Sequence, residues 1–264
     1  MTGATAPRRD RLVVFVLLVI VGVLAWAYTV HQARTMDAME AAMWRDMNMS
    51  MNGMEPSWTL VDVVLMFAMW SAMMAAMMVP GSAPVVGAFA TINRSRRERG
   101  AVSVPTAIFL GGYLAVWAVF SAVAVFLQWA LQMSGLLTTM MQSASLWLSA
   151  VLFAVAGLYQ FSPLKERCLD YCRSPDGFIL SEWRDGPVGA FVMGWRHGLF
   201  CLGCCAALML LLFAVAVMDL RWVAALTILV TAEKLLPGGR FWRVALGAAL
   251  LSAAAAFAIA AVRS

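Results

Sequence analysis

The stretch VGAFVMGWRHGLFCLGCCAALMLLLFAVAVM, residues 188–218, decides the fold because only one of its side chains, Arg196, is fully charged at neutral pH. A bilayer core about 30 Å thick needs about 20 apolar residues per helical span, so this run predicts a transmembrane helix. It is too long for one straight span, and we expect its first turns to tilt or to lie at the membrane interface. The run is continuous rather than alternating, which favours a helix over a strand of a transmembrane barrel.

The composition of the whole chain indicates the same class of protein. Hydrophobic residues make up 63% of the 264 residues and charged residues 12%, with a mean hydropathy of +0.82. A soluble domain has about 45–50% apolar and about 25% charged residues, and a disordered chain has the opposite bias. The basic residues fall in short clusters between apolar runs, which is typical of membrane topology. We therefore predict an integral protein of the lipid bilayer with no nucleic acid partner.

Six further apolar segments also qualify as membrane spans, so the sequence predicts an all-α polytopic bundle of about seven transmembrane helices. The seven segments are Leu12–Val30, Trp58–Val79, Pro105–Leu127, Ala144–Phe161, Val188–Met218, Trp222–Leu236 and Phe241–Val262. With the N-terminus inside, 15 of the 19 Lys and Arg residues lie on the cytoplasmic side. The positive-inside rule therefore predicts an N-in, C-out, multi-pass membrane protein.

The chain is expected to divide near residue 57. Residues 1–57 would form the first transmembrane helix and an external methionine-rich loop, and residues 58–264 a six-helix membrane domain with the metal-binding core. Residues 1–27 also fit a cleavable signal peptide, because a basic start precedes an apolar run and an Ala-Trp-Ala triplet. Cleavage would leave six spans without changing the sidedness of the rest.

The external loop reads MDAMEAAMWRDMNMSMNGM over residues 36–54. Thioethers are soft, neutral ligands that select Cu(I) over harder cations, and they do not form disulfides in an oxidising compartment. An amphipathic surface helix accounts for the spacing of the first methionines but not for the alternation that follows. The loop is therefore a candidate for metal capture on the periplasmic side, through Met47, Met49, Met51 and Met54.

A second group of methionines lies in the predicted span 58–79. At about 100° per residue, its members share an arc of about 80° on one helix face. A methionine stripe often serves only for packing, whereas an intramembrane carboxylate is a functional candidate by default. The candidates for a ladder that passes a soft metal inward are Asp62, Met66, Met69, Met73 and Met77.

The cysteines of residues 188–218 form the most specific pattern. Spacings of i, i+3 and i+4 bring four candidate metal ligands to one helix face, namely His197, Cys201, Cys204 and Cys205. Imidazole and thiolates together suit Zn, Cu(I) or an iron–sulfur cluster. Two alternatives stay open: small apolar thiols that pack between helices, and a redox CxxC formed by Cys201 and Cys204.

Another pair, Cys168 and Cys172, lies in the predicted cytoplasmic connection at i, i+4 spacing. Alone this pair is weak evidence, but it supplies a second set of soft ligands on the side of His197. Near the cytoplasmic end of the sixth predicted span lies Glu233-Lys234. We interpret it either as a lysine that snorkels to the interface beside a boundary carboxylate, or as a carboxylate that partners a cationic site.

Five stretches taken together resemble a known family. They are MMAAMMVP (73–80), GGYLAVW (111–117), YQFSPLKERCLDYCRSP (159–175), GLFCLGCCAALM (198–209) and EK (233–234). In this order they are similar to bacterial predicted metal-binding integral membrane proteins, some of which are labelled copper chaperones. The resemblance covers roughly residues 58–262 and implies that the cysteines, His197 and the second-span methionines hold the metal. Ala206 and Asp219 depart from the family pattern, which has a bulky aromatic residue and an asparagine there.

We therefore expect a protein that binds Cu(I), or else Zn or another soft metal, and transfers or transports it across or within the membrane. A soluble metal-delivery partner or a membrane complex would fit this role, and the oligomeric state stays open. Two other classes remain: a membrane thiol–disulfide or electron-transfer protein, and a structural subunit whose soft residues only pack. No nucleotide-binding motif is visible in the sequence, so ATP-driven pumping is not expected.

Overall fold

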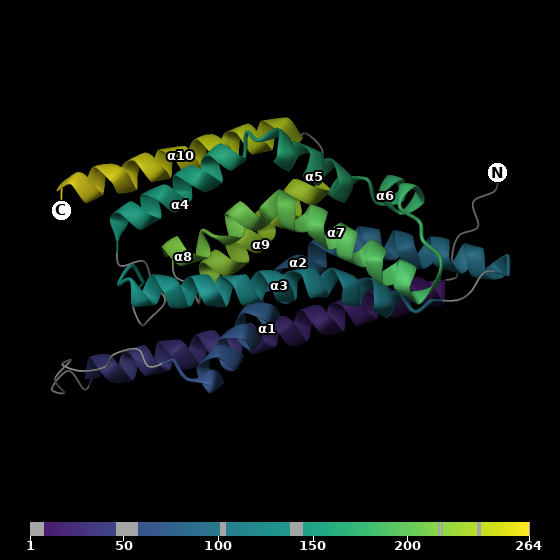
Figure 1. Cartoon of the computed structure of the whole chain (residues 1–264), viewed down its shortest axis with the longest axis horizontal. Helices are drawn as coiled ribbons and strands as arrows, with labels where there is room; N and C mark the ends of the chain where they lie inside the picture. The colour runs from purple at the N-terminus through teal and green to yellow at the C-terminus, as the bar shows by residue number, and fades with distance from the viewer. Residues whose placement is uncertain are drawn as a thin grey trace.

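The computed structural model of the chain describes residues 8–45, 58–100, 104–137, 145–215, 217, 219–236 and 239–263. Within those ranges the regular elements are all helices, which confirms the predicted all-α class. They are α1 (Arg8–Arg45), α2 (Leu60–Glu98), α3 (Thr106–Met133), α4 (Leu146–Tyr159), α5 (Pro163–Arg173), α6 (Pro175–Ser181), α7 (Gly186–Met209), α8 (Leu212–Val215), α9 (Leu220–Leu235) and α10 (Gly239–Arg263). Figure 1 shows α4 and α10 side by side along one edge, α1 along the opposite edge, and α3, α7 and α9 between them.

Several helices are suited to a membrane. In the described part of the chain, 4 segments are long and apolar enough to cross one: Leu60–Glu98, Thr106–Met133, Gly186–Val215 and Arg240–Arg263. A fifth candidate is the pair α4 and α5, which bend by 65° at their junction. Helix α9 has 16 residues, fewer than the about 20 that a span needs. These helices indicate association with a membrane, whereas the count of seven spans and the N-in, C-out orientation stay predictions.

Helix α1 continues beyond the predicted first span and ends at Arg45. The first part of the methionine-rich segment is therefore helical, as the alternative of an amphipathic helix anticipates for residues 36–45. Met47, Met49, Met51 and Met54 lie outside the described residues, and their predicted role in metal capture stays a prediction.

The bend between α4 and α5 follows from the local sequence Tyr159-Gln-Phe-Ser-Pro163. The residue before a proline is disfavoured in helical conformation, so α4 cannot run on through Ser162. Ser162 instead begins α5, where its side chain accepts a hydrogen bond from Leu164 N at 3.1 Å and Pro163 occupies the first turn. The bend turns α5 against α7, with which it makes extensive contact.

Helices α3 and α7 approach each other closely because glycines face the partner backbone. A Cβ on Gly112 would lie 2.1 Å from the carbonyl oxygen of Phe191, and one on Gly194 would lie 1.9 Å from that of Phe109. A backbone oxygen cannot move aside as the end of a side chain can, so only glycine fits at these two positions. The close approach fixes the register in which α3 faces the cysteines of α7.

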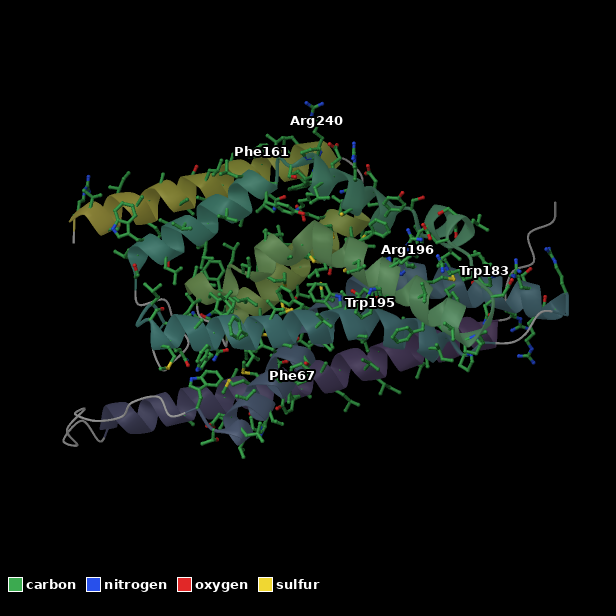
Figure 2. The ribbon with its side chains drawn as sticks, in the orientation of Figure 1. Phe67, Phe161, Trp183, Trp195, Arg196 and Arg240 are labelled. Atoms are coloured by element: carbon green, nitrogen blue, oxygen red, sulfur yellow. The ribbon has the colours of Figure 1, made fainter. Side chains whose placement is uncertain are left out.

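One end of the bundle carries ion pairs between segments far apart in the sequence. Arg96 near the end of α2 pairs with Asp185, which precedes α7, at 2.9 Å, and its guanidinium carbon lies 4.9 Å from the ring centroid of Trp183. Arg196 of α7 pairs with Glu182, and Figure 2 shows Arg196 and Trp183 at the same end. The predicted orientation requires Arg96 and Arg196 to share a side of the membrane, and it stays a prediction.

Candidate metal centre

The cysteines of α7 share one face, as predicted, and Cys201, Cys204 and Cys205 are all buried. The Sγ atoms of Cys204 and Cys205 each donate a hydrogen bond to the carbonyl oxygen of Cys201 at 3.0 Å. These are bonds back to the preceding turn, of the kind that short polar side chains make within a helix. The three sulfur atoms therefore lie along one turn of α7 in the core of the bundle.

Helix α5 brings the second cysteine pair to the same place. The side chain of Cys172 interacts with the thiols of Cys201 and Cys204. Cys168 lies against α7, where a Cβ on Gly203 would come within 2.7 Å of its Sγ. All five cysteines are buried and free of disulfides. The two sets thus form one cluster, which we call the thiol cluster: Cys168, Cys172, Cys201, Cys204 and Cys205.

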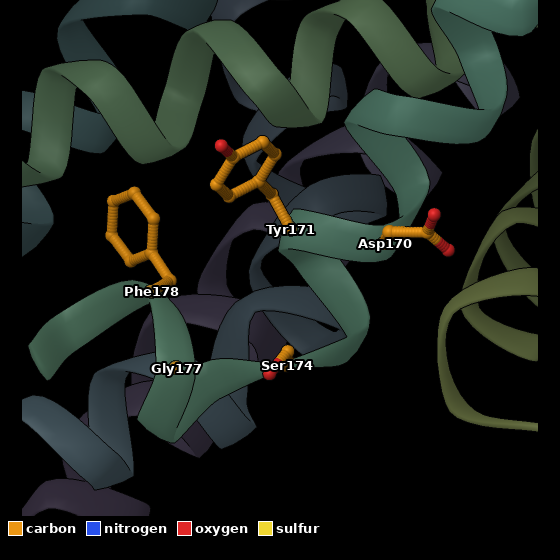
Figure 3. A pocket seen from close by; sticks show the side chains of 5 residues that line it. All are labelled: Asp170, Tyr171, Ser174, Gly177 and Phe178. Carbon is orange, nitrogen blue, oxygen red and sulfur yellow. The ribbon is translucent and has the colours of Figure 1, made fainter. Parts of the chain in front are cut away.

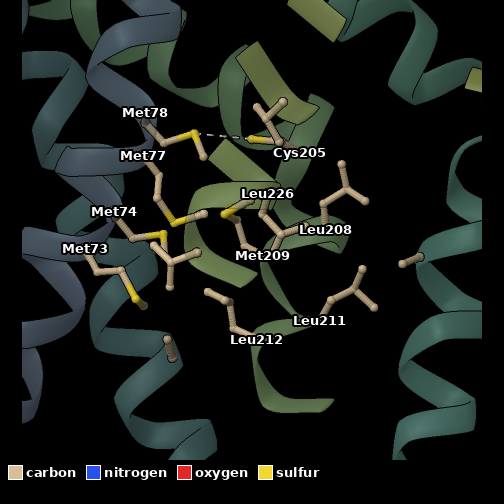
Figure 4. Close-up of a cluster of buried hydrophobic side chains, with 14 of the residues drawn as sticks. Met73, Met74, Met77, Met78, Cys205, Leu208, Met209, Leu211, Leu212 and Leu226 are labelled. Carbon is tan, nitrogen blue, oxygen red and sulfur yellow. Dashed lines mark hydrogen bonds between the residues drawn. The ribbon is translucent and has the colours of Figure 1, made fainter. Parts of the chain in front are cut away.

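A thioether reaches this cluster from α2. Met78 Sδ lies 3.8 Å from Cys205 Sγ, as the dashed line in Figure 4 marks. The same view shows Met74 and Met77 extending from α2 toward α7, with Met209 opposite them. Met78 is off the stripe predicted from the sequence, so helical spacing did not select the thioether that lies beside Cys205.

The residues of the predicted stripe fall into two groups. Met69, Met73 and Met77 are buried in the core, whereas Met66 is half-buried and its Sδ accepts a hydrogen bond from Gln128 Nε2 at 3.7 Å. Asp62 accepts hydrogen bonds from Thr59 N and Oγ1 at 2.9 and 2.7 Å and completes the capping box at the start of α2. The capping box explains why a carboxylate stands at this position without any bound metal ion. A role of the methionine stripe in metal binding stays a prediction.

Tyr113 of α3 links the sulfur atoms to the backbone of α2. Its hydroxyl donates a hydrogen bond to the carbonyl oxygen of Met78 at 3.1 Å and lies 3.2 Å from Cys201 Sγ. A buried tyrosine hydroxyl usually finds a hydrogen-bond partner, and here both of its neighbours belong to the thiol cluster or adjoin it. No pattern of soft ligands in the sequence singles out this residue.

Lys234 does not snorkel to an interface, which corrects the first interpretation of Glu233-Lys234. Its side chain is 5% exposed, and Nζ donates a hydrogen bond to Cys201 Sγ at 3.0 Å. An ammonium group beside a sulfur atom stabilises negative charge on that sulfur. The signal in the sequence is the occurrence of an ionisable residue within an apolar helix, which is by default a functional candidate.

Glu233 forms a buried ion pair with the other lysine. Lys165 Nζ lies 2.8 and 3.0 Å from the two carboxylate oxygens of Glu233, and it also donates to Gln160 Oε1. Arg173 Nε donates to the backbone oxygen of Glu233 at 2.9 Å. These contacts hold α5 against α9. The cationic partner of the Glu233 carboxylate is therefore the Lys165 side chain.

His197 lies one turn before Cys201 and is buried among aromatic rings. Its ring centroid is 5.4 Å from that of Tyr113 and 5.3 Å from that of Phe178. Within the described part of the chain, the buried Nδ1 atom has no hydrogen-bond partner. Buried polar atoms normally have a partner, which can be an ordered water or an ion. His197 thus lies buried one turn from Cys201, and its predicted role as a metal ligand stays a prediction.

A pocket lies on the outer side of these rings, where α5 meets α6. Asp170, Tyr171, Ser174, Gly177 and Phe178 line it (Figure 3). No sulfur atom lies among these residues. Phe178 thus lines the pocket and also packs on the ring of His197.

The thiol cluster lies in an apolar core beside the thioether of Met78 and the ammonium group of Lys234. Soft sulfur ligands of this kind select Cu(I). Among the residues that the structure describes, however, no three His, Cys, Asp or Glu side chains converge as a ready-made metal site. Cys204 and Cys205 donate hydrogen bonds to the helix backbone, and Cys201 accepts one from Lys234. Binding of an ion by Cys204 or Cys205 would displace the thiol proton and so end that hydrogen bond.

Comparison with known proteins identifies the family. No curated protein and no solved structure matches the chain. The sequence profile of the PpoB2 copper chaperone family matches residues 67–257, which include α3 to α9 in full and most of α2 and α10. The whole thiol cluster, Met78 and Lys234 lie within this match, which supports a copper-related role. The chain belongs to the PpoB2 copper chaperone family.

Proposed function

We propose that this protein binds Cu(I) in the thiol cluster and passes it across or within the bacterial inner membrane. The observation that carries the proposal is the meeting of α2, α5 and α7, which brings Met78, Cys172 and Cys205 into one buried sulfur site. Sulfur ligands without a carboxylate among them favour a soft monovalent ion over Mg²⁺, Ca²⁺ or Mn²⁺. Copper is the cargo of the protein in this view.

The route would run from methionine to cysteine. Met47, Met49, Met51 and Met54 would capture the ion outside, and the buried methionines of α2 would lead to the thiols. Met69, Met73 and Met77 recur along one face of α2 at intervals of four residues, and a rise of about 1.5 Å per residue places successive methionines about one turn apart. Exchange between adjacent soft ligands would move the ion without exposing it to water.

The experiment is Cu(I) loading of protein purified without oxygen in lipid nanodiscs, followed by metal quantification. Wild type is compared with Cys201→Ser/Cys205→Ser and with a variant in which Met47, Met49, Met51 and Met54 are all leucine. We expect the first variant to lose the tightly held ion and the second to lose only weaker, additional copper. Met133→Leu, at a side chain that is 57% exposed at the end of α3, serves as the control and should change neither. Unchanged copper content in the double serine variant would overturn the proposal.

A second candidate, a thiol–disulfide or electron-transfer protein, has one specific observation in its favour. Cys172 contacts Cys201 and Cys204, so a disulfide could form when two thiols give up two protons and two electrons to a quinone-class acceptor. Quinone reduction that depends on these cysteines and proceeds without copper would support this candidate instead. Zn in place of Cu(I) is tested by the same metal analysis.

A further inference from the structure

The chain has two lysines, and both are buried with different hydrogen-bond acceptors. Lys165 is paired with the carboxylate of Glu233. Lys234 follows Glu233 directly, yet it forms no salt bridge with a carboxylate in the described part of the chain. Its hydrogen-bond acceptor is Cys201 Sγ at 3.0 Å. The Glu233 charge is already neutralised, so Lys234 leaves one positive charge at the thiol cluster.

A buried ammonium group requires a negative partner, because an isolated charge is costly in an apolar interior. Cys201 provides that partner when it is a thiolate. The position is built for the lysine: a Cβ on Gly81 of α2 would lie 3.3 Å from Lys234 Cδ and 3.4 Å from Nζ. The side chain thus passes α2 at a residue with no side chain of its own, next to Met78.

We propose that Lys234 determines the charge of the metal ion that the thiol cluster accepts. Two thiolates that hold a monovalent ion carry one net negative charge, which the ammonium group of Lys234 neutralises. The same ligands with a divalent ion are already neutral, and the lysine would then be a buried, unpaired cation. Lys234 would therefore favour Cu(I) or Ag(I) over Zn(II) through electrostatics, in addition to the softness of the sulfur ligands. This inference rests on the proposed function and names the determinant of its specificity.

The test compares Ag(I) and Zn(II) affinities of the full chain in nanodiscs, with Lys234→Leu, Lys234→Gln and Lys234→Arg. Leucine and glutamine introduce no soft ligand, and glutamine keeps an N–H donor toward Cys201. A unit charge within about 4 Å at an effective dielectric constant near 20 changes an equilibrium by about 10²- to 10³-fold. We expect both neutral variants to shift the ratio of Ag(I) to Zn(II) affinity toward Zn(II) by at least about 10²-fold. The arginine variant should retain the preference of the wild type.

Arg240→Gln provides the matched control, because this side chain is exposed and points outward at the start of α10 (Figure 2). Removal of its charge should leave the ratio unchanged. Circular dichroism and gel filtration verify that each variant is folded. An unchanged ratio in Lys234→Leu and Lys234→Gln, with wild-type protein that binds Ag(I) or Cu(I), overturns this inference alone. Wild-type protein that binds neither ion overturns both this inference and the proposed function.

Discussion

Met78 of α2 and Cys205 of α7 place a thioether and a thiol 3.8 Å apart, although 127 residues separate them in the sequence. Neither is exposed, and Tyr113 holds the Met78 backbone through its carbonyl oxygen at 3.1 Å. The row of buried methionines on α2 therefore meets the thiol cluster at Met78 and Cys205.

Substitution of Met78 by leucine keeps the volume of the side chain nearly constant and removes the sulfur. If Met78 contributes to Cu(I) binding, Met78→Leu should weaken the affinity by about 10- to 100-fold, the range typical of losing a supporting group at a metal site. Competition with a Cu(I)-selective chelator measures the affinity. Met69→Leu, buried farther along the same helix, should have a smaller effect. Equal affinities for Met78→Leu and wild type would exclude this thioether from the site.

The ion pair between Lys165 and Glu233 should be important for stability. Lys165 is 0% and Glu233 5% exposed, so removing one partner leaves an uncompensated buried charge. We expect Lys165→Leu to lower the free energy of unfolding by about 3–5 kcal/mol, and Lys165→Leu/Glu233→Leu to recover much of that loss. Denaturant unfolding in detergent measures both. Arg167→Leu, at an exposed position on the same helix, should cost little. A double variant no more stable than Lys165→Leu would argue against charge as the cause.

Neighbouring glycines of α3 offer a matched test of the contact with α7. Gly112→Ala places a Cβ 2.1 Å from the Phe191 oxygen, whereas Gly111→Ala has nothing within 4 Å. Both exchanges raise helix propensity equally. We expect Gly111→Ala to be neutral or stabilising by about 0.5–1 kcal/mol, and Gly112→Ala to be destabilising by about 1–3 kcal/mol. Thermal unfolding followed by circular dichroism compares the two. Similar melting temperatures would mean that α3 and α7 are farther apart than described.

Asp185, in the turn before α7, should make stability depend on pH in the acidic range. Its hydrogen bond from Trp183 Nε1, and next the charge of Arg96, lower the pKa of this carboxyl below its ordinary value of 3.8. A lowered pKa in the folded state means that the stabilisation is present above 3.8 and is lost as the pH falls through the folded value. Asp185→Asn should therefore reduce Tm at pH 7, and the difference from wild type should shrink below pH 3.8. A difference that is constant with pH would mean that ionisation of Asp185 does not contribute to stability.

The sequence predicts the helical class and the shared face of the α7 cysteines because both follow from local periodicity. It does not predict that Cys172 reaches Cys201, since this depends on the 65° bend at Ser162-Pro163 and on how α5 then packs. Lys234 illustrates the same limit. From its position near a helix end, snorkelling is the ordinary expectation, and only the packing of α9 against α2 beside Gly81 turns the side chain inward.

Chemical modification of the cysteines should show whether the thiol cluster binds metal or serves only for packing. All five are buried, so a charged maleimide should label the folded protein slowly and the denatured protein completely. Ag(I) bound to the thiol cluster should protect Cys201 and Cys205 from a small, membrane-permeant alkylating reagent, as read by mass spectrometry of peptides. The alkylation rate of Cys172 shows whether α5 takes part in binding. A rate lowered by Ag(I) places α5 in the site, whereas equal rates with and without Ag(I) confine the ion to α7 and Met78. No protection at any cysteine would leave packing as the role of the cluster.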